Sequence, residues 1–139
     1  MYQNDWILRQ IEMLGAAFAR IVKALREGRT EEALDLTDEA MAETLGIDPA
    51  LAETLDAPSL TMLVTMGPDG ARRAFLAGEL LTARTLALTA AGRREDAARE
   101  GERARALLLA ARPDAGEGAS ERIGELLGWL DDPDEHDGA

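Results

Sequence analysis

The stretch GRTEEA at residues 28–33 recurs as GRREDA at residues 92–97, and these two copies decide the fold that the sequence predicts. Each copy begins with a glycine, which can end a helix in the left-handed conformation. An acidic pair follows, and it favours the start of the next helix because the helix dipole is positive there. A further alanine comes seven residues after the alanine of each copy, at Ala40 and Ala104. We therefore expect two hairpins of paired helices that cross closely through small residues.

Helical signals extend outward from both copies over most of the chain. The expected helices cover residues 4–27, 31–45, 49–55, 59–66, 71–91, 95–111 and 120–130. Thr30, Asp48 and Ser120 are the expected N-caps, because their side-chain oxygens can accept backbone N–H bonds. Gly46 is the expected stop of the second helix, and Gly78 inside a long helix marks a close contact between helices. No segment sustains the alternation of a strand, so the predicted class is all-α.

The alanine spacing of the two hairpins resembles the second half of a tetratricopeptide repeat. The offset between the copies is 64 residues, longer than the roughly 34 of that repeat, and its Trp, Leu-Gly and Tyr signature is lacking. The predicted fold is thus one of antiparallel, tetratricopeptide-repeat-like helical hairpins. We expect a repeat-like domain at residues 1–112, a flexible linker at 113–119, a C-terminal helix at 120–130 and an acidic tail at 131–139.

The first five residues, Met-Tyr-Gln-Asn-Asp, are a second point of resemblance. They resemble the start of an uncharacterised family of small bacterial helical proteins with tetratricopeptide-repeat-like hairpins. The resemblance covers roughly the first 45 residues well and residues 69–112 loosely. That family has no assigned activity, so the resemblance implies a fold and supplies no catalytic residues.

The first expected helix carries an apolar seam with heptad spacing, formed at its start by Ile7, Ile11, Leu14 and Phe18. Such a seam packs one helix against another. One interpretation is that it packs inside the chain's own domain. The other is that it is also a self-association surface, which would make the protein a homodimer.

The charges of the chain are unevenly distributed. Residues 31–71 hold 10 acidic residues and no Lys or Arg, in a chain of net charge −12. Glu31, Asp35, Glu39 and Glu43 are spaced by four, which places them in one stripe along a helix. The stripe has three interpretations: a solvated face, a face compensated by basic residues of the first helix, or a docking surface for a basic protein partner. The basic residues concerned are Arg20, Lys23 and Arg26.

The composition argues against several classes of function. A net charge of −12 repels nucleic-acid phosphates and anionic lipids, and no apolar run approaches the roughly 20 residues of a membrane span. The N-terminus lacks a signal peptide, so we expect a cytoplasmic protein. The sequence has no cysteine and one histidine, His136, and it contains no nucleotide-binding fingerprint. We therefore expect no metal, no cofactor and no catalytic residues.

The leading hypothesis is a non-catalytic protein–protein interaction or scaffold module that can self-associate, because a stack of hairpins exposes helix faces as binding surfaces. The alternative is a small-ligand-binding protein or an enzyme with a pocket between the hairpins. A deep pocket with converging arginines or carboxylates of perturbed pKa would favour that alternative. A third interpretation is the subunit of a structural oligomer.

Overall fold

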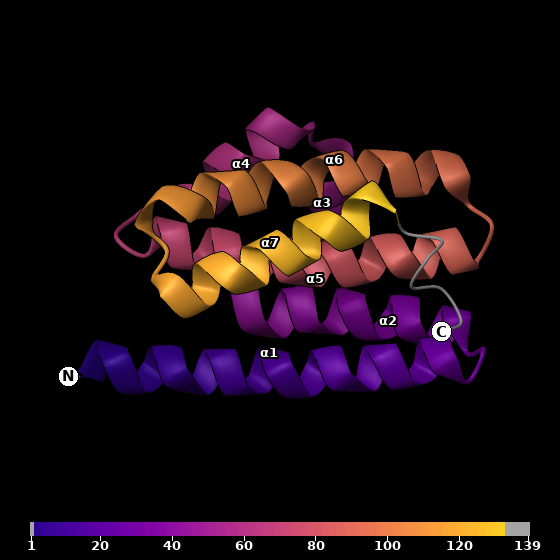
Figure 1. Cartoon of the computed structure of the whole chain (residues 1–139), viewed down its shortest axis with the longest axis horizontal. Coiled ribbons are helices and arrows are strands. Elements are labelled where there is room, and N and C mark those ends of the chain that lie inside the picture. The colour runs from indigo at the N-terminus through magenta and orange to yellow at the C-terminus, as the bar shows by residue number, and fades with distance from the viewer. Residues whose placement is uncertain (1, 133–139) are drawn as a thin grey trace.

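The structure is a stack of helical hairpins around one central helix. The computed structural model describes the backbone of residues 2–132 and the side chains of residues 12–132. Figure 1 shows α1 and α2 along one edge, α5 and α6 as the next pair, and α7 lying across α5. All described elements are helical and hairpin partners run antiparallel, so the predicted all-α class is confirmed. In chain order the elements are α1 (Tyr2–Arg26), α2 (Thr30–Ala40), the π-helical turn η1 (Met41–Leu45), α3 (Pro49–Thr54), α4 (Ala57–Thr65), α5 (Gly70–Ala90), α6 (Arg94–Ala111), the 3₁₀ turn η2 (Arg112–Asp114) and α7 (Glu117–Asp131).

Both copies of the repeated stretch form the same turn. Gly28 and Gly92 each have a φ of 76°. The next residue has φ −89° and ψ 66° at Arg29, and φ −90° and ψ 70° at Arg93. In both turns the arginine N–H donates to the carbonyl five residues earlier, at 2.8 and 2.9 Å, as in a Schellman motif. The sequence repeat is therefore also a repeat of backbone conformation.

The second helix departs from its prediction at the start and in its last turn. Thr30 is not the N-cap, because the Schellman turn already leaves Arg29 in a non-helical conformation at that position and Thr30 is the first helical residue. At Met41 the helix changes into the π-helical turn, which ends at Leu45. Gly46 then has a φ of 67°, so its predicted role as the stop is confirmed.

The short α3 begins as the sequence predicts. Asp48 is its N-cap, and the carboxylate accepts a hydrogen bond from the N–H of Ala50 at 3.0 Å. Pro49 occupies the first helical position, where its missing N–H costs nothing. Asp56 caps α4 in the same way, by accepting from the N–H of Ser59 at 2.8 Å, so α4 starts two residues before its predicted start.

The C-terminal helix is longer than predicted. Ser120 is not its N-cap: α7 begins at Glu117, with Gly116 in the N-cap position, and the glutamate suits the positive end of the helix dipole. The helix packs on α5 and α6 and buries Ile123 and Leu126 completely. The flexibility expected for residues 113–119 stays a prediction, and residues 133–139 of the expected acidic tail lie outside the described residues.

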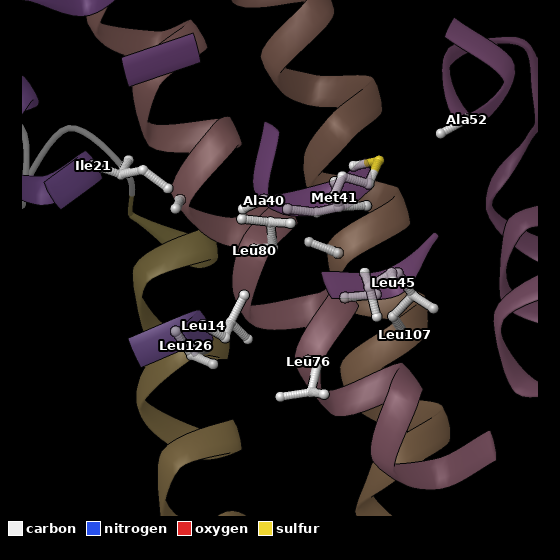
Figure 2. Close-up of a cluster of buried hydrophobic side chains, with 14 of the residues drawn as sticks. Leu14, Ile21, Ala40, Met41, Leu45, Ala52, Leu76, Leu80, Leu107 and Leu126 are labelled. Carbon is white, nitrogen blue, oxygen red and sulfur yellow. The ribbon is translucent and has the colours of Figure 1, made fainter. Parts of the chain in front are cut away.

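The core is centred on α5, which packs against α1, α2, α4, α6 and α7. Every residue from Leu80 to Leu88 is buried. Figure 2 shows Leu80 among side chains contributed by α1, the second helix, α6 and α7. Each fully buried leucine stabilises the fold by about 1.5–3 kcal/mol relative to an exposed one, so α5 is the main apolar support of the fold.

Gly78 marks a close approach of α5 and α6. A Cβ at this position would lie 2.7 Å from Cδ2 and 3.3 Å from the backbone N of Leu108. The close contact predicted from the sequence is thus confirmed. Gly101, the glycine inside α6, sits more loosely, since a Cβ there would lie 3.6 Å from Cγ2 of Thr85.

Candidate functional site

The four carboxylates of the predicted acidic stripe all lie at the surface. Glu31, Asp35 and Glu39 extend along α2, and Glu43 follows in the π-helical turn. Among the described residues, none of the four forms an ion pair; the ion pairs of α2 involve Glu32 and Asp38 instead. The basic residues of α1 that could have compensated the stripe form no ion pair with it in this part of the chain. The four carboxylates are therefore exposed and uncompensated among the described residues, and their role as a docking surface stays a prediction.

Two of the stripe residues, Glu39 and Glu43, line a groove between α1 and α2. The hollow has a volume of about 160 Å³. Polar and apolar surface contribute about equally to its lining, and Met13 in it is 51% exposed. The other lining residues are Ala16, Ala17, Arg20, Leu36, Ala40 and Thr44. The fold thus brings the acidic stripe beside an exposed apolar edge of α1, which the sequence pattern did not predict.

The structure describes the side chains of only two residues of the predicted self-association seam, Leu14 and Phe18. Leu14 is buried in the chain's own core, and Phe18 is half-buried against Trp129. The side chains of Ile7 and Ile11 lie outside the described residues. The described part of the seam therefore serves packing within the chain, and the homodimer stays a prediction.

A buried arginine in α5 links four helices. The side chain of Arg84 is 7% exposed. Its Nε donates to Oε2 of Glu100 in α6 at 2.7 Å, and its Nη2 donates to Oε1 of Glu53 in α3 at 2.9 Å. Its Nη1 donates to the Asp38 carboxylate and, at 3.3 Å, to the Thr37 hydroxyl, both in α2. The guanidinium suits this position because its N–H donors point outward in one rigid plane.

A second arginine, Arg103 of α6, holds the C-terminal end of α3. Its Nε donates to the carbonyl of Leu55 at 2.8 Å, and its Nη2 donates to the carbonyl of Glu53 at 3.0 Å. Carbonyls at a helix end lack partners within the helix, so Arg103 caps α3 from outside. Its Nη1 also lies 3.4 Å from Oε1 of Glu100. We call Arg84, Arg103, Asp38, Glu53 and Glu100 the arginine cluster.

Burial perturbs two carboxylates of the arginine cluster. It raises the pKa of Glu100, because the loss of solvation disfavours the charged form more than Arg84 and Arg103 favour it. Burial likewise raises the pKa of Asp38, against the opposing effect of Arg84. The ion pairs therefore offset the cost of burial only in part, as is common for buried pairs.

A polar hollow of about 150 Å³ opens beside the arginine cluster, with Arg93, Asp96 and Arg99 also in its lining. A carboxylate of perturbed pKa in a hollow is a frequent mark of a functional site. Here, however, each nitrogen of Arg84 and both oxygens of Glu100 are bonded to other protein groups. The hollow is also smaller than the roughly 300–1,000 Å³ of typical ligand sites. The arrangement thus connects helices and leaves few polar atoms free for a ligand.

Neither a metal site nor a membrane span is found in the described part of the chain. No group of three or more His, Cys, Asp or Glu side chains there is placed to hold a metal ion. None of the helices described is long and apolar enough to cross a membrane. His136 lies outside the described residues.

Sequence reasoning missed Arg84 and Asp38. A usable signal existed for Arg84, which is the only charged residue between Glu79 and Arg93. A charge inside such an apolar stretch is costly unless it is paired, so its isolation predicts buried partners. Asp38 carries no comparable signal, because it directly precedes Glu39 of the stripe and only the packing of α2 separates the two.

Comparison with known proteins finds no matching family model, no matching curated protein and no matching solved structure. The resemblance of the N-terminal residues therefore stands only as that of a small all-helical protein, without a family.

Proposed function

We propose that this chain is a non-catalytic protein-interaction module that binds a basic, amphipathic segment of a partner protein in the groove between α1 and α2. One observation carries the proposal: the exposed carboxylates of Glu39 and Glu43 lie in one groove with the half-exposed Met13, and Arg20 is the only cation among the described residues of that lining. A basic segment would place Lys or Arg near the two carboxylates and one apolar side chain in the groove.

Charge complementarity supports a basic partner. Residues 31–71 contain no Lys or Arg, and the stripe carboxylates form no ion pair among the described residues. A partner would therefore break no internal pair on binding. Complementary charge speeds association and selects the partner, whereas each exposed ion pair contributes only about 0–1 kcal/mol. The apolar contacts in the groove have to supply much of the affinity.

A tetratricopeptide-like arrangement of the hairpins is part of the proposal. The alanines of the repeated pattern, Ala33 and Ala40 in α2 and Ala97 and Ala104 in α6, are all buried. Small buried residues let two helices cross closely, and stacked hairpins of this kind expose helix faces as binding surfaces. The α1–α2 groove is such a surface.

A second candidate function is a small-ligand-binding protein that uses the hollow beside the arginine cluster. The raised pKa of Glu100 favours it. A ligand would have to displace ion pairs of Arg84 that already satisfy both partners, at a cost that the exposed α1–α2 groove does not impose. The interaction module is therefore the preferred function.

The test is a titration of the full chain into a fluorescently labelled amphipathic peptide of lysine, alanine and leucine, followed by anisotropy. Glu39→Gln with Glu43→Gln should weaken binding by about 3- to 30-fold, since each lost ion pair contributes up to about 1 kcal/mol. The matched control is Glu31→Gln with Asp35→Asn, which removes the same charge from the same stripe outside the groove. The control should weaken binding less, and the affinity of the unchanged chain should fall with salt.

Two results would contradict this proposed function. If the two double variants weakened peptide binding equally, the peptide would be attracted by the acidic surface in general, and the α1–α2 groove would not be the binding site. Unchanged affinity in the Glu39→Gln with Glu43→Gln variant would mean that these two carboxylates do not take part in binding. Circular dichroism of every variant shows that the fold is retained, which is expected because all four side chains are exposed.

A further inference from the structure

A second and larger groove lies on another side of α1, where the side chains of Arg122 and Trp129 of α7 reach it. The hollow has a volume of about 580 Å³ and an apolar lining formed mainly by Phe18, Val22 and Trp129. Lys23 and Arg26 of α1 line it as well, together with Arg122 of α7. These α1 residues differ from those of the α1–α2 groove, so one helix contributes to two separate surfaces.

The aromatic wall of this groove is held in place by Arg122. The rings of Phe18 and Trp129 stack with centroids 6.1 Å apart and an angle of 26° between their planes. The guanidinium carbon of Arg122 lies 5.1 Å from the Phe18 centroid and 5.2 Å from the Trp129 centroid, within the range of a cation–π interaction. Arg122 Nε also donates to Glu79 at 2.9 Å, and its Nη1 donates to Glu125 at 3.0 Å. The wall is thus preformed, and the charge of Arg122 is already paired.

Lys23 and Arg26 at the edge of the groove differ from Arg122, whose charge is already paired. Lys23 and Arg26 are exposed, and neither forms an ion pair among the described residues. The one carboxylate of the lining, Glu27, is engaged by Arg29 at 2.9 Å. Both basic residues lie in the last turn of α1, where a positive charge interacts favourably with the negative end of the helix dipole. An apolar wall therefore faces two cations whose donors have no partner within residues 12–132.

We infer that the α1–α7 groove binds an acidic amphipathic segment of a partner protein, with an apolar side chain against Val22 and Trp129 and carboxylates toward Lys23 and Arg26. The observation behind this is complementarity: a ligand for this groove needs an apolar anchor and negative charge together. An interaction surface that joins aromatic anchors with exposed basic residues also matches the residue types that dominate binding energy. The inference concerns a different groove from the proposed function, with a ligand of opposite charge, so either can fail alone.

The experiment uses tryptophan fluorescence as the readout. The sequence holds two tryptophans, Trp6 and Trp129, so Trp6→Phe in the full chain makes Trp129 the only one. The probe is a synthetic amphipathic peptide of glutamate, alanine and leucine, with the leucines on one face. Binding should change the Trp129 emission in a saturable way. The double variant Lys23→Gln with Arg26→Gln should weaken the affinity for the peptide by about 3- to 30-fold.

The matched control removes two positive charges elsewhere. Arg72→Gln with Arg112→Gln changes exposed arginines that do not line the groove, and it should weaken binding much less than the groove pair. Equal weakening by both pairs, or no saturable change in Trp129 emission, would overturn the inference. A mass that doubles with concentration, and that Lys23→Gln with Arg26→Gln returns to the monomer, would also overturn it, because a second copy would then fill the groove. Val22→Ala gives an independent check, since loss of the apolar contact should weaken peptide binding without any change of charge.

Discussion

The α1–α2 and α5–α6 hairpins are closed by the same turn, yet their surroundings differ. The α5–α6 hairpin is covered by α2, α4 and α7, and it supplies Arg84, Arg103 and Glu100 of the arginine cluster. The α1–α2 hairpin lies at the edge of the stack (Figure 1), and grooves open on two sides of α1. The comparison shows that local sequence determines the hairpin, whereas the neighbouring elements determine whether its polar side chains link helices or meet solvent.

The second helix shows the same difference within a few residues. Asp38 turns inward to Arg84, while Glu39, its neighbour in sequence, faces solvent beside the α1–α2 groove. Successive residues of an α-helix point about 100° apart, so adjacent acids can serve unrelated purposes. We therefore expect the α5–α6 hairpin, the inner hairpin, and the α1–α2 hairpin, the edge hairpin, to differ in how strongly single substitutions change the stability of the protein.

The largest effect is expected from Arg84→Ala. Removing one partner of a buried pair costs about 3–5 kcal/mol, because Glu100, whose side chain is 7% exposed, would lose its 2.7 Å partner and keep only the longer contact with Arg103 at 3.4 Å. Asp38 and Glu53 are 40% and 58% exposed and can be solvated instead. Urea unfolding measures the loss. The double variant Arg84→Met with Glu100→Leu should regain most of it, and a double variant as unstable as the single one would refute the account.

A smaller difference is expected between the two helical glycines of the inner hairpin. Gly78→Ala should destabilise the protein by about 1–3 kcal/mol, because the new Cβ would overlap Leu108, which is fully buried and cannot move away easily. Gly101→Ala should instead stabilise it by up to about 1 kcal/mol, through the higher helix propensity of alanine. Thermal unfolding of both variants tests this, and a common sign would show that the two contacts do not differ.

The two hairpin turns should respond alike. Gly28→Ala and Gly92→Ala should each cost about 1–2 kcal/mol, since both glycines have a φ of 76°, which disfavours residues with a Cβ. A methyl group added at either glycine would meet no atom within 4 Å, so the cost is conformational. Asparagine, which tolerates this conformation better, should cost less at both sites. Clearly unequal losses in chemical unfolding would mean that the edge hairpin unfolds separately from the core.

The smallest effect concerns pH. The pKa of Glu100 is raised by burial, so this group contributes stability that is fully present below the unfolded-state pKa, about 4.3. That contribution is lost as the pH rises through the folded-state pKa. Glu100→Gln should therefore flatten the decline in stability between mildly acidic and neutral pH. Urea midpoints at several pH values measure the slope, and a slope unchanged by Glu100→Gln would assign the pH dependence to other groups.

The hairpins could be predicted from the sequence because their signals are local. Gly28 and Gly92 end helices through their own backbone freedom, and the acids that follow favour the next helix without help from distant residues. The grooves and the arginine cluster depend on contacts between segments far apart in the chain, such as Arg84 with Asp38. Periodicity shows which residues share a helix face but not which helix covers that face, so the stripe that contains Glu39 could be predicted while the apolar residues beside Glu39 could not.

The π-helical turn Met41–Leu45 affects the direction in which the carboxylates of the acidic stripe point around the helix axis. In an α-helix a step of four residues overshoots a full turn by about 40°, so Glu31, Asp35 and Glu39 drift steadily around the axis of α2. A π-helical turn holds more residues, and the step from Glu39 to Glu43 therefore rotates less. The drift slows where the α1–α2 groove lies, and the last two carboxylates face the same hollow. The wider turn at the end of the helix thus keeps the carboxylate of Glu43 on the same side as that of Glu39.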